Sequence, residues 1–390
     1  MWLILNQKRN DDDQKENLEI QWHCNISMRK NKGVICDMIK FIDKKNKFIE
    51  VFDKNTGLYV RTGVIENGKD TGVDPFMRCF PALIDVGIMN KCVCAKKCNV
   101  DCYQRAIDRC GANMSLEGYK SILEQCKGKT FQYALGGAGD PDTHEHFEEI
   151  LKLSNEYGIV PNFTTSGIMM TEWKAKLCKK YCGAVAVSEH FADYTQKAID
   201  MLLSAGVKTN IHFVLSKNSI DYAIDKLKNG GFDSRINAVV FLLYKPIGLG
   251  KKENILTMDN PKVKEFFELV DKDNYPHKIG FDSCSCGGIV NFAEHIDMDS
   301  IDFCEGGRYS MYIDSQMNAM PCSFGNQNSK YFVDLNKYSI EQAWNSDVFN
   351  KFRNSLCNSC PSCKDRAMCG GGCPICRDIV LCDREEKELV

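Results

Sequence analysis

Cysteine is the residue type whose number and spacing point to chemistry in this chain. The 390 residues contain 22 cysteines, and most of them stand in two groups. The first group lies within eleven residues and consists of Cys92, Cys94, Cys98 and Cys102. The second group has eleven members, from Cys284 to Cys382. Disulfide scaffolds are typically short secreted chains, whereas thiolates at short spacing are typical of metal and iron–sulfur sites in a reducing compartment, so we expect metal sites.

The first group has the spacing of an open iron–sulfur site. Cys94, Cys98 and Cys102 form a C-x3-C-x3-C run soon after a predicted strand at 83–89. Three thiolates on one short loop can hold three irons of a [4Fe–4S] cluster. The coordination position that remains open is what distinguishes a catalytic metal site from a structural one. Cys92 could supply a fourth ligand and close the site, and a zinc site is the other alternative, although no histidine lies nearby.

The second group is built around one run of specific spacing. A Cys-x2-Cys-x5-Cys-x3-Cys pattern consists of Cys360, Cys363, Cys369 and Cys373. Upstream, Cys304 and Cys322 stand at the ends of a segment that predicts two short strands around a turn. The region has one convincing helix, at 340–355, and few apolar runs, so we expect bound metal rather than a core to hold it together. Two structural zinc knuckles are the alternative to iron–sulfur clusters.

The elements that must position the first group alternate between strands and helices. Short apolar runs are separated by amphipathic segments of about 10–15 residues, a pattern that indicates βαβ units and a parallel sheet. The predicted strands are 83–89, 131–135, 160–164, 184–187, 209–215 and 238–243, and the predicted helices are 115–126, 143–157, 171–181, 194–205, 220–229 and 261–271. This α/β series fits a partial (β/α)6 TIM-like barrel at least as well as a doubly wound sheet. Both place functional residues on the loops that follow the strands.

Glycines and polar residues follow several of these strands. They are Gly136, Gly137 and Ala138 after the second strand and Thr165, Ser166, Ser188 and Asn210 near later ones. Glycines let a ligand approach the backbone closely, and polar groups along one rim can surround a single small molecule. The alternative is a tight strand-to-helix connection for the glycines and ordinary strand-end caps for the polar residues.

The composition excludes several classes of partner. The chain has 50 basic and 52 acidic residues and a net charge of −2, so it lacks the basic surface that nucleic acids or anionic membranes require. No apolar run approaches the length of a membrane-spanning helix. The apolar residues 2–5 are too few for a signal peptide, so we expect a cytoplasmic protein.

Three parts are predicted along the chain. Residues 1–75 are polar and charged, and they contain a β-hairpin with strands at 48–52 and 58–64 joined by the turn 53–57. Residues 76–283 form the barrel, and residues 284–390 form the cysteine-rich domain. The hairpin segment is expected to lie on the barrel as an accessory.

Residues 80–250 resemble the radical S-adenosylmethionine (SAM) superfamily in a cysteine triplet after the first strand and a Gly-Gly turn after the second. The resemblance implies that Cys94, Cys98 and Cys102 hold a [4Fe–4S] cluster whose open iron takes the amino and carboxylate groups of SAM. It also implies that the residues against the methionyl amino group are Gly136, Gly137 and Ala138, and that those near the ribose and sulfonium are Thr165, Ser166, Ser188 and Asn210.

Two departures from the pattern of that superfamily keep Cys92 a candidate ligand. The usual spacing is C-x3-C-x2-C with an aromatic residue before the last cysteine, whereas here Tyr103 follows it. The usual Gly-Gly-Glu-Pro reads Gly-Gly-Ala-Gly-Asp-Pro in this chain.

The C-terminal cysteines resemble the SPASM extension of radical SAM enzymes that modify peptides. The resemblance implies two auxiliary [4Fe–4S] clusters, and therefore three clusters in the protein. The nearer one would be bound by Cys304, Cys322 and Cys373, and the farther one by Cys360, Cys363, Cys369 and Cys382. Cys376 competes with Cys382, and either Cys284 or Cys286 could complete the nearer cluster, whose fourth position could also stay open. Cys357 has no assigned role.

The resemblance implies an enzyme that cleaves SAM reductively and uses the 5′-deoxyadenosyl radical to remove a hydrogen from its substrate. The expected substrate is a precursor peptide or small protein made on the ribosome, in which a crosslink such as a thioether forms, and the expected electron donor is a flavodoxin or ferredoxin. One alternative resembles the anaerobic sulfatase-maturing enzymes, in which an aspartate follows the cysteine of the Pro-Cys pair; here Ser323 stands there. The other alternative is a non-catalytic iron–sulfur protein that carries electrons or binds a partner.

Overall fold

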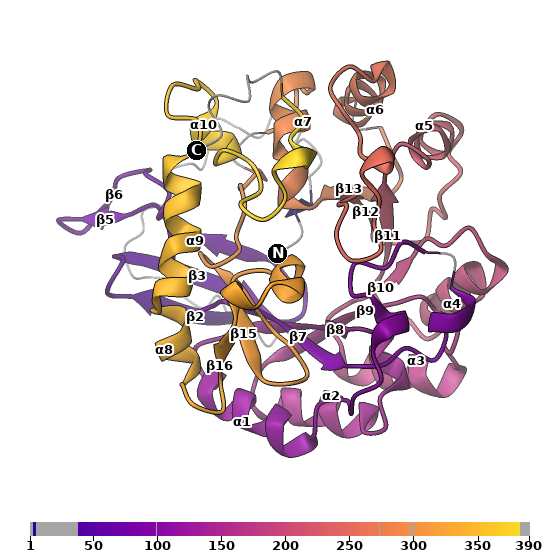
Figure 1. The fold of residues 1–390 in the computed structure, drawn as a ribbon, viewed down its shortest axis with the longest axis horizontal. Coiled ribbons are helices and arrows are strands. Elements are labelled where there is room, and N and C mark those ends of the chain that lie inside the picture. Colours follow the sequence, from indigo (N-terminus) through magenta and orange to yellow (C-terminus); the bar gives the residue numbers. More distant parts are fainter. Residues whose placement is uncertain (1–2, 5–37, 99, 273, 298–299, 383–390) are drawn as a thin grey trace, which may run out of the picture.

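A largely parallel sheet forms the centre of the fold. The computed structural model describes residues 3–4, 38–98, 100–272, 274–297 and 300–382, and its largest sheet has eleven strands in the order β1-β13-β12-β11-β10-β9-β8-β7-β14-β15-β16. These strands are β1 (Leu3–Ile4), β7 (Leu83–Met89), β8 (Gln132–Gly137), β9 (Val160–Thr165), β10 (Val185–Ser188), β11 (Thr209–Leu215), β12 (Ala238–Leu243), β13 (Lys278–Phe281), β14 (Ser310–Ile313), β15 (Asn318–Met320) and β16 (Val333–Asp334). Strands β7 to β13 are all parallel and follow one another around an arc (Figure 1).

Six helices cover the outer face of this arc, one after each strand from β7 to β12 (Figure 1). They are α1 (Leu116–Cys126), α2 (Phe147–Glu156), α3 (Glu172–Tyr181), α4 (Asp193–Ser204), α5 (Ile220–Asn229) and α6 (Pro261–Asp271). The predicted partial (β/α)6 barrel is therefore confirmed. Helix α2 begins later than predicted because Pro141–Thr143 form a separate 3-10 turn. No helix within the described ranges is both long and apolar enough to cross a membrane.

The strands separate an apolar outer face from a more polar inner face. Val187, Ile211 and Val239 stand at one level of three neighbouring strands and pack in the core. The next residue along β11, His212, points to the opposite side and hydrogen-bonds to Thr164 on β9 at 3.1 Å. Because side chains alternate along a strand, the barrel encloses polar groups while its helices cover apolar ones.

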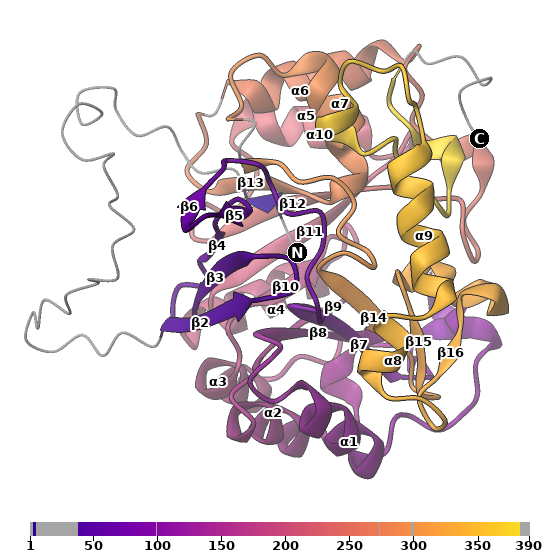
Figure 2. The same ribbon diagram turned by 90° about the vertical axis from the view of Figure 1, so that its left-hand side faces the viewer.

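A small N-terminal sheet lies at the amino ends of the barrel strands (Figure 2). It has three strands, β2 (Met38–Asp43), β3 (Phe48–Asp53) and β4 (Tyr59–Arg61), and a separate two-stranded ribbon follows, β5 (Ile65–Glu66) and β6 (Lys69–Asp70). Phe52 packs against Ala82 and Phe131, which directly precede β7 and β8. The predicted hairpin is thus part of a larger sheet, whose strand β2 the sequence pattern did not predict.

The cysteine-rich part continues the main sheet. Strand β14 pairs in parallel with β7, so hydrogen bonding runs across the predicted boundary at 283. Its helices are α7 (Cys286–Phe292), α8 (Ile340–Trp344), α9 (Asp347–Asn358) and α10 (Arg366–Cys369). The single helix predicted at 340–355 is two helices, because the Ser346 side chain caps the start of α9.

Candidate functional site

The first cysteine group lies on the loop after β7. Cys94 and Cys98 flank the 3-10 turn Ala95–Lys97. Burial raises the pKa of the Cys92 thiol, and the nearby Asp140, Cys94 and Cys98 raise it further. Cys92 therefore lies close to the predicted ligands Cys94 and Cys98, and it remains a candidate ligand.

The loop that follows β12 fixes the end of this cysteine loop. The amide of Leu249 donates to the carbonyl of Cys102 at 3.0 Å. The carboxylate of Asp101 accepts hydrogen bonds from the Tyr244 hydroxyl at 2.9 Å and from Asn254 at 3.0 Å. Since Asp101 directly precedes Cys102, these bonds hold that cysteine to the barrel rim.

The three residues of the glycine turn differ in the space around them. Gly136 and Gly137 end β8 rather than follow it. Gly137 has a φ of +117°, and a Cβ there would overlap the backbone of Met89. The amide of Ala138 donates to the Met89 carbonyl at 2.8 Å, so it serves strand pairing. A Cβ on Gly136 would meet no atom within 4 Å, so of the three only Gly136 leaves room for a ligand.

The residues predicted to line the rim differ in where they lie and in what their side chains contact. Thr165 is buried and donates to Asp142 at 2.8 Å. The amide of Ser166 donates to Asp140 at 2.9 Å, and its hydroxyl donates to the second oxygen of the same carboxylate. Both residues therefore tie β9 to the glycine-rich loop. Ser188 ends β10 on the level of His212.

Asn210 does not stand at the rim, and that expectation is wrong. It is the second residue of β11, at the amino end of the strand, where its side chain accepts a hydrogen bond from Asn237 at 2.8 Å. The predicted strand at 209–215 coincides with β11, so its boundaries were right. The error was to assign Asn210, the second residue of that strand, to the rim at the carboxyl ends of the strands.

Two residues near the first cysteine group were not predicted from the sequence. The Tyr194 hydroxyl lies 3.1 Å from Nδ1 of His190, on the connection between β10 and α4. Burial raises the pKa of Tyr194, and Cys98 and Cys94 raise it further, so its phenol lies near the cysteine loop. No motif marks this pair, because only the packing of α4 brings it to the loop.

The two cysteine regions meet through aromatic side chains. The ring of Tyr103, directly after Cys102, lies 4.6 Å from the ring of Phe324, two residues after Cys322. Burial raises the pKa of Tyr103, which also hydrogen-bonds with Ser323. The loop of the first group therefore touches the segment that carries a predicted auxiliary ligand.

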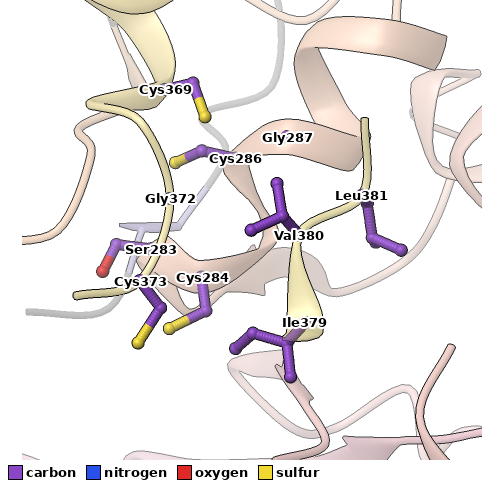
Figure 3. Close-up of a pocket in the computed structure, with 10 residues that line it drawn as sticks. All are labelled: Ser283, Cys284, Cys286, Gly287, Cys369, Gly372, Cys373, Ile379, Val380 and Leu381. Atoms are coloured by element: carbon purple, nitrogen blue, oxygen red, sulfur yellow. The ribbon is translucent and has the colours of Figure 1, made fainter. Parts of the chain in front are cut away.

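Four partly buried cysteines gather beside this contact. Burial raises the pKa of Cys304 and of Cys322, and the proximity of Cys284 raises both further. A hydrogen bond with Cys373, together with burial, raises the pKa of Cys284. Figure 3 shows the sulfur atoms of Cys284 and Cys373 turned toward the same space. Cys284 therefore lies beside the three cysteines predicted for the nearer auxiliary cluster.

A buried lysine stands against this group. The ammonium of Lys245 donates to Asp282 at 2.7 Å and to the Leu243 carbonyl at 2.8 Å, and it lies 4.6 Å from the ring centre of Phe324. Burial alone would lower the pKa of Lys245, but Asp282 and Cys284 raise it above the ordinary value. The lysine is a fixed positive charge next to the thiols.

Cys286 and Cys376 occupy positions between the predicted clusters. Cys286 is 1% exposed, and it lines one small cavity together with Cys369, Cys284 and Cys373 (Figure 3). The backbone amide of Cys376 donates to the sulfur of Cys373 at 3.3 Å. Such a bond to a ligand sulfur tunes a cluster without ligating it.

The wrapping loop between Cys369 and Cys373 depends on three glycines. Gly370, Gly371 and Gly372 all have positive φ, at 60°, 75° and 85°. A Cβ on Gly370 would overlap the ring of Phe303. Three successive residues in the left-handed region turn the chain sharply between the two predicted ligands. Residues other than glycine rarely adopt this backbone conformation.

The thiols fit iron–sulfur clusters by their chemistry. Within the described ranges, no three Cys, His, Asp or Glu side chains are grouped tightly enough to hold one metal ion. The raised pKa values of Cys284, Cys304 and Cys322 make these thiols costly as thiolates unless a metal neutralises them, and metal binding releases their protons. A [4Fe–4S] cluster takes one thiolate at each of four irons, which suits thiols spread around a space.

Comparison with known proteins agrees with this reading of the C-terminal part. Residues 304–365 match the SPASM family, described as an iron–sulfur cluster-binding domain. No curated protein matches the chain. The expected cysteine-rich iron–sulfur domain is thus confirmed.

Solved structures share the fold of nearly the whole chain. SuiB from Streptococcus suis bound to the precursor peptide SuiA is 13% identical with a TM-score of 0.66, over 87% of this chain and 94% of that one. The enzyme anSMEcpe with bound AdoMet and a Kp18Cys peptide is 17% identical with a TM-score of 0.56, over 76% of this chain and 91% of that one. The fold is therefore that of radical SAM proteins with a SPASM-type extension.

Proposed function

We propose that this chain is a radical SAM enzyme with a SPASM-type iron–sulfur domain, and that it cleaves S-adenosylmethionine to modify a peptide. The contact between the two cysteine regions carries the proposal. Tyr103 and Phe324 join the loop of Cys102 to the segment of Cys322, so a substrate bound there lies within reach of both. SuiB is described with a precursor peptide and anSMEcpe with AdoMet and a peptide, which supports the same pair of ligands here.

In this proposal Cys94, Cys98 and Cys102 hold the SAM-binding cluster, with Cys92 beside them. With SAM bound, the cluster supplies a 5′-deoxyadenosyl radical that can remove an unactivated hydrogen. The open space at Gly136 admits the methionyl end of SAM. Ser188, at the end of β10, and Ser166, held by Asp140, are the remaining rim candidates for its ribose.

The residues of the chain contribute orientation. A displacement of about 1 Å between reacting atoms can cost on the order of 10²-fold in rate. The hydrogen bonds of Asp101 to Tyr244 and Asn254 therefore matter, because they fix Cys102 against the rim. The polar barrel interior, with the Thr164–His212 pair, gives SAM and substrate fixed partners in place of water.

The auxiliary clusters are proposed to lie on the substrate side of the barrel. Cys284, Cys304, Cys322 and Cys373 hold the nearer one, and the ligands proposed for the farther one are Cys360, Cys363, Cys369 and Cys382. Cluster potentials depend on net charge, burial and hydrogen bonds to sulfur. Lys245 and the amide of Cys376 supply two of these influences at the nearer cluster. A flavodoxin or ferredoxin is the proposed electron donor.

The finer proposal is that the substrate is a cysteine-rich precursor peptide and that the bond formed is a thioether. Ser323 hydrogen-bonds with Tyr103 beside Cys322 and cannot act as the base that an aspartate there would provide. This favours a crosslink over oxidation of a single side chain.

The proposal is tested with a small cysteine-rich peptide encoded beside this gene. The reconstituted protein, SAM and reductant are incubated with the peptide without oxygen, and the products are analysed by mass spectrometry. We expect the peptide to lose two hydrogens for each crosslink and one cysteine to resist alkylation. A peptide that loses two hydrogens while all its cysteines remain alkylatable indicates the side-chain dehydrogenase instead. A peptide that stays unchanged while SAM is cleaved excludes it as the substrate.

A further inference from the structure

An open cavity of about 380 Å³ lies between the loop after β12 and the cysteine-rich part. Pro246 and Ile247 form the wall on the barrel side. The opposite wall comes from the 3-10 turns Ser323–Gln327 and Ser329–Tyr331 and from the segment after Cys373. The cavity is therefore formed by segments from both predicted domains.

Two unpaired cations line this cavity. Lys330 and Arg377 stand on different segments of its wall, and neither forms an ion pair within the described part of the chain. The one acidic lining residue, Asp378, is bound by Lys252 at 2.8 Å. With that carboxylate matched, the cavity carries an excess of positive charge.

The other lining groups suit a peptide rather than a small anion. Phe324 and Tyr331 contribute aromatic surface, and Gln327 and Asn328 contribute side-chain amides that can bond to a peptide backbone. Aromatic residues and arginine are enriched where proteins bind other polypeptides. The size and openness of the cavity also exceed what a single inorganic anion needs.

The cavity adjoins both proposed cluster sites. Phe324 contacts Tyr103 of the first cysteine loop at 4.6 Å, and its ring centre lies 4.6 Å from the ammonium of Lys245. Cys376, which also lines the cavity, donates its amide to the sulfur of Cys373. A chain seated in the cavity would thus continue directly to the contact between the two cysteine regions.

We infer that this cavity binds an acidic segment of the peptide substrate, with Lys330 and Arg377 bonding to its carboxylates. The identification of that peptide as a substrate rests on the proposed function, whereas the binding of acidic peptide does not. Charge-assisted pairing fixes the direction and register of the peptide, and the aromatic walls cover its backbone.

The test measures peptide binding directly, by fluorescence anisotropy with the reconstituted full-length protein. One fluorescein-labelled probe is a decapeptide of alternating Glu and Gly, and the other replaces every Glu with Gln. We expect the Glu probe to bind about tenfold more tightly, because two exposed ion pairs form, and to weaken as salt is raised. The double variant K330E/R377E should lose that preference. The milder variant K330Q/R377Q should lose the preference as well, and its thermal unfolding shows whether the fold is retained.

Lys337→Glu is the matched control, because Lys337 is an exposed lysine of the same region that does not line the cavity and pairs with Asp334. The Lys337→Glu variant should prefer the Glu probe as strongly as the unchanged protein does. Equal affinity for the two probes, or an unchanged preference in the double variants, overturns the inference. So does binding of inorganic phosphate without binding of either peptide. If the protein prefers the Glu probe but fails to cleave SAM, the proposed function fails and the acidic-peptide site stands.

Discussion

Lys245 is a buried positive charge beside the proposed nearer auxiliary cluster. The residue is 5% exposed, and its ammonium is paired with Asp282 and close to Cys284. A buried charge acts strongly on its neighbours because solvent screens it little. A reduced cluster carries one more negative charge than an oxidised one, so the lysine favours the reduced state.

Replacing Lys245 with methionine should therefore make the nearer auxiliary cluster harder to reduce. We expect a shift of the reduction equilibrium of about tenfold, or about 59 mV for one electron, toward more negative potential. Lys245→Arg keeps the charge and should keep the potential. The measurement is a redox titration followed by electron paramagnetic resonance, with K245M/D282N included because methionine alone leaves Asp282 without its cation. Equal potentials in the methionine and arginine variants would show that the charge has no such role.

Cys284 and Cys286 differ by two positions but should differ in function. Cys284 is near Cys304, Cys322 and Cys373, whereas the thiol of Cys286 donates to the Asp302 carbonyl at 3.3 Å. We expect Cys284→Ser to change the resonance signal of the nearer cluster or to lose up to about four irons. Cys286→Ser should leave that signal unchanged. The reverse pattern would contradict the assignment.

The candidate ligands were predictable at the residue scale because cysteine spacing is a local property. Cys284, Cys286 and an open position were the three alternatives for the fourth place at the nearer cluster, and only packing distinguishes Cys284 from Cys286. Lys245 and Tyr194 come to the thiols from a strand end and a helix that are distant in sequence. No local sequence pattern predicts contacts between residues that are so distant in sequence. Asn210 was misplaced although the strand at 209–215 was predicted with the right ends, because a residue near the start of the strand was assigned to the rim at its carboxyl end.

At the scale of elements, the βα series was predictable because each strand is a short apolar run and each helix an amphipathic one. The departures have local causes. Ser346 caps a new helix in place of one continuous helix, and Pro141 starts a 3-10 turn before α2. Helix α7 follows Cys286 within a Cys- and Gly-rich segment of low helix propensity, so packing rather than propensity forms it.

The end of β8 allows a matched pair of substitutions. Gly137→Ala places a Cβ against the backbone of Met89 at a φ of +117°, and we expect a loss of stability of about 1–3 kcal/mol or more. Gly136→Ala meets no atom within 4 Å and should unfold like the unchanged protein. It should nevertheless weaken SAM binding, because the methyl group fills the space proposed for the ligand. Thermal unfolding and equilibrium binding of SAM test both, and normal SAM affinity in Gly136→Ala would exclude that position.

At the scale of the whole molecule, the barrel and the cysteine-rich part form one sheet. Strand β14 pairs with β7, and the buried guanidinium of Arg308 donates to the Phe76 carbonyl at 2.6 Å and to Asp302 at 3.0 Å. The sequence predicted the content of both parts but not this junction, because strand partners distant in sequence leave no periodic signal. Residues 357–382 lie outside the sheet, and we expect them to depend most on metal bound by their cysteines.

Loss of a farther-cluster ligand should therefore act locally. In Cys363→Ala the segment from 357 to 382 loses metal-dependent stability, while the barrel keeps the rest of the shared hydrophobic core, to which this segment contributes Cys376, Ile379 and Leu381. We expect 5′-deoxyadenosine to form on reduction while the modified peptide disappears. Both products are measured in one anaerobic assay with the precursor peptide. Full peptide modification would mean that the farther cluster takes no part in turnover.

The central claim is that the loop after β7 carries a SAM-cleaving cluster in a protein with three clusters. The most direct measurement compares iron content and 5′-deoxyadenosine formation in the anaerobically reconstituted protein and in the variant with Cys94, Cys98 and Cys102 all changed to alanine. We expect about twelve irons and SAM cleavage in the unchanged protein, and about eight irons without cleavage in the variant. Stoichiometric zinc with little iron, or SAM cleavage that survives in the triple variant, would contradict it.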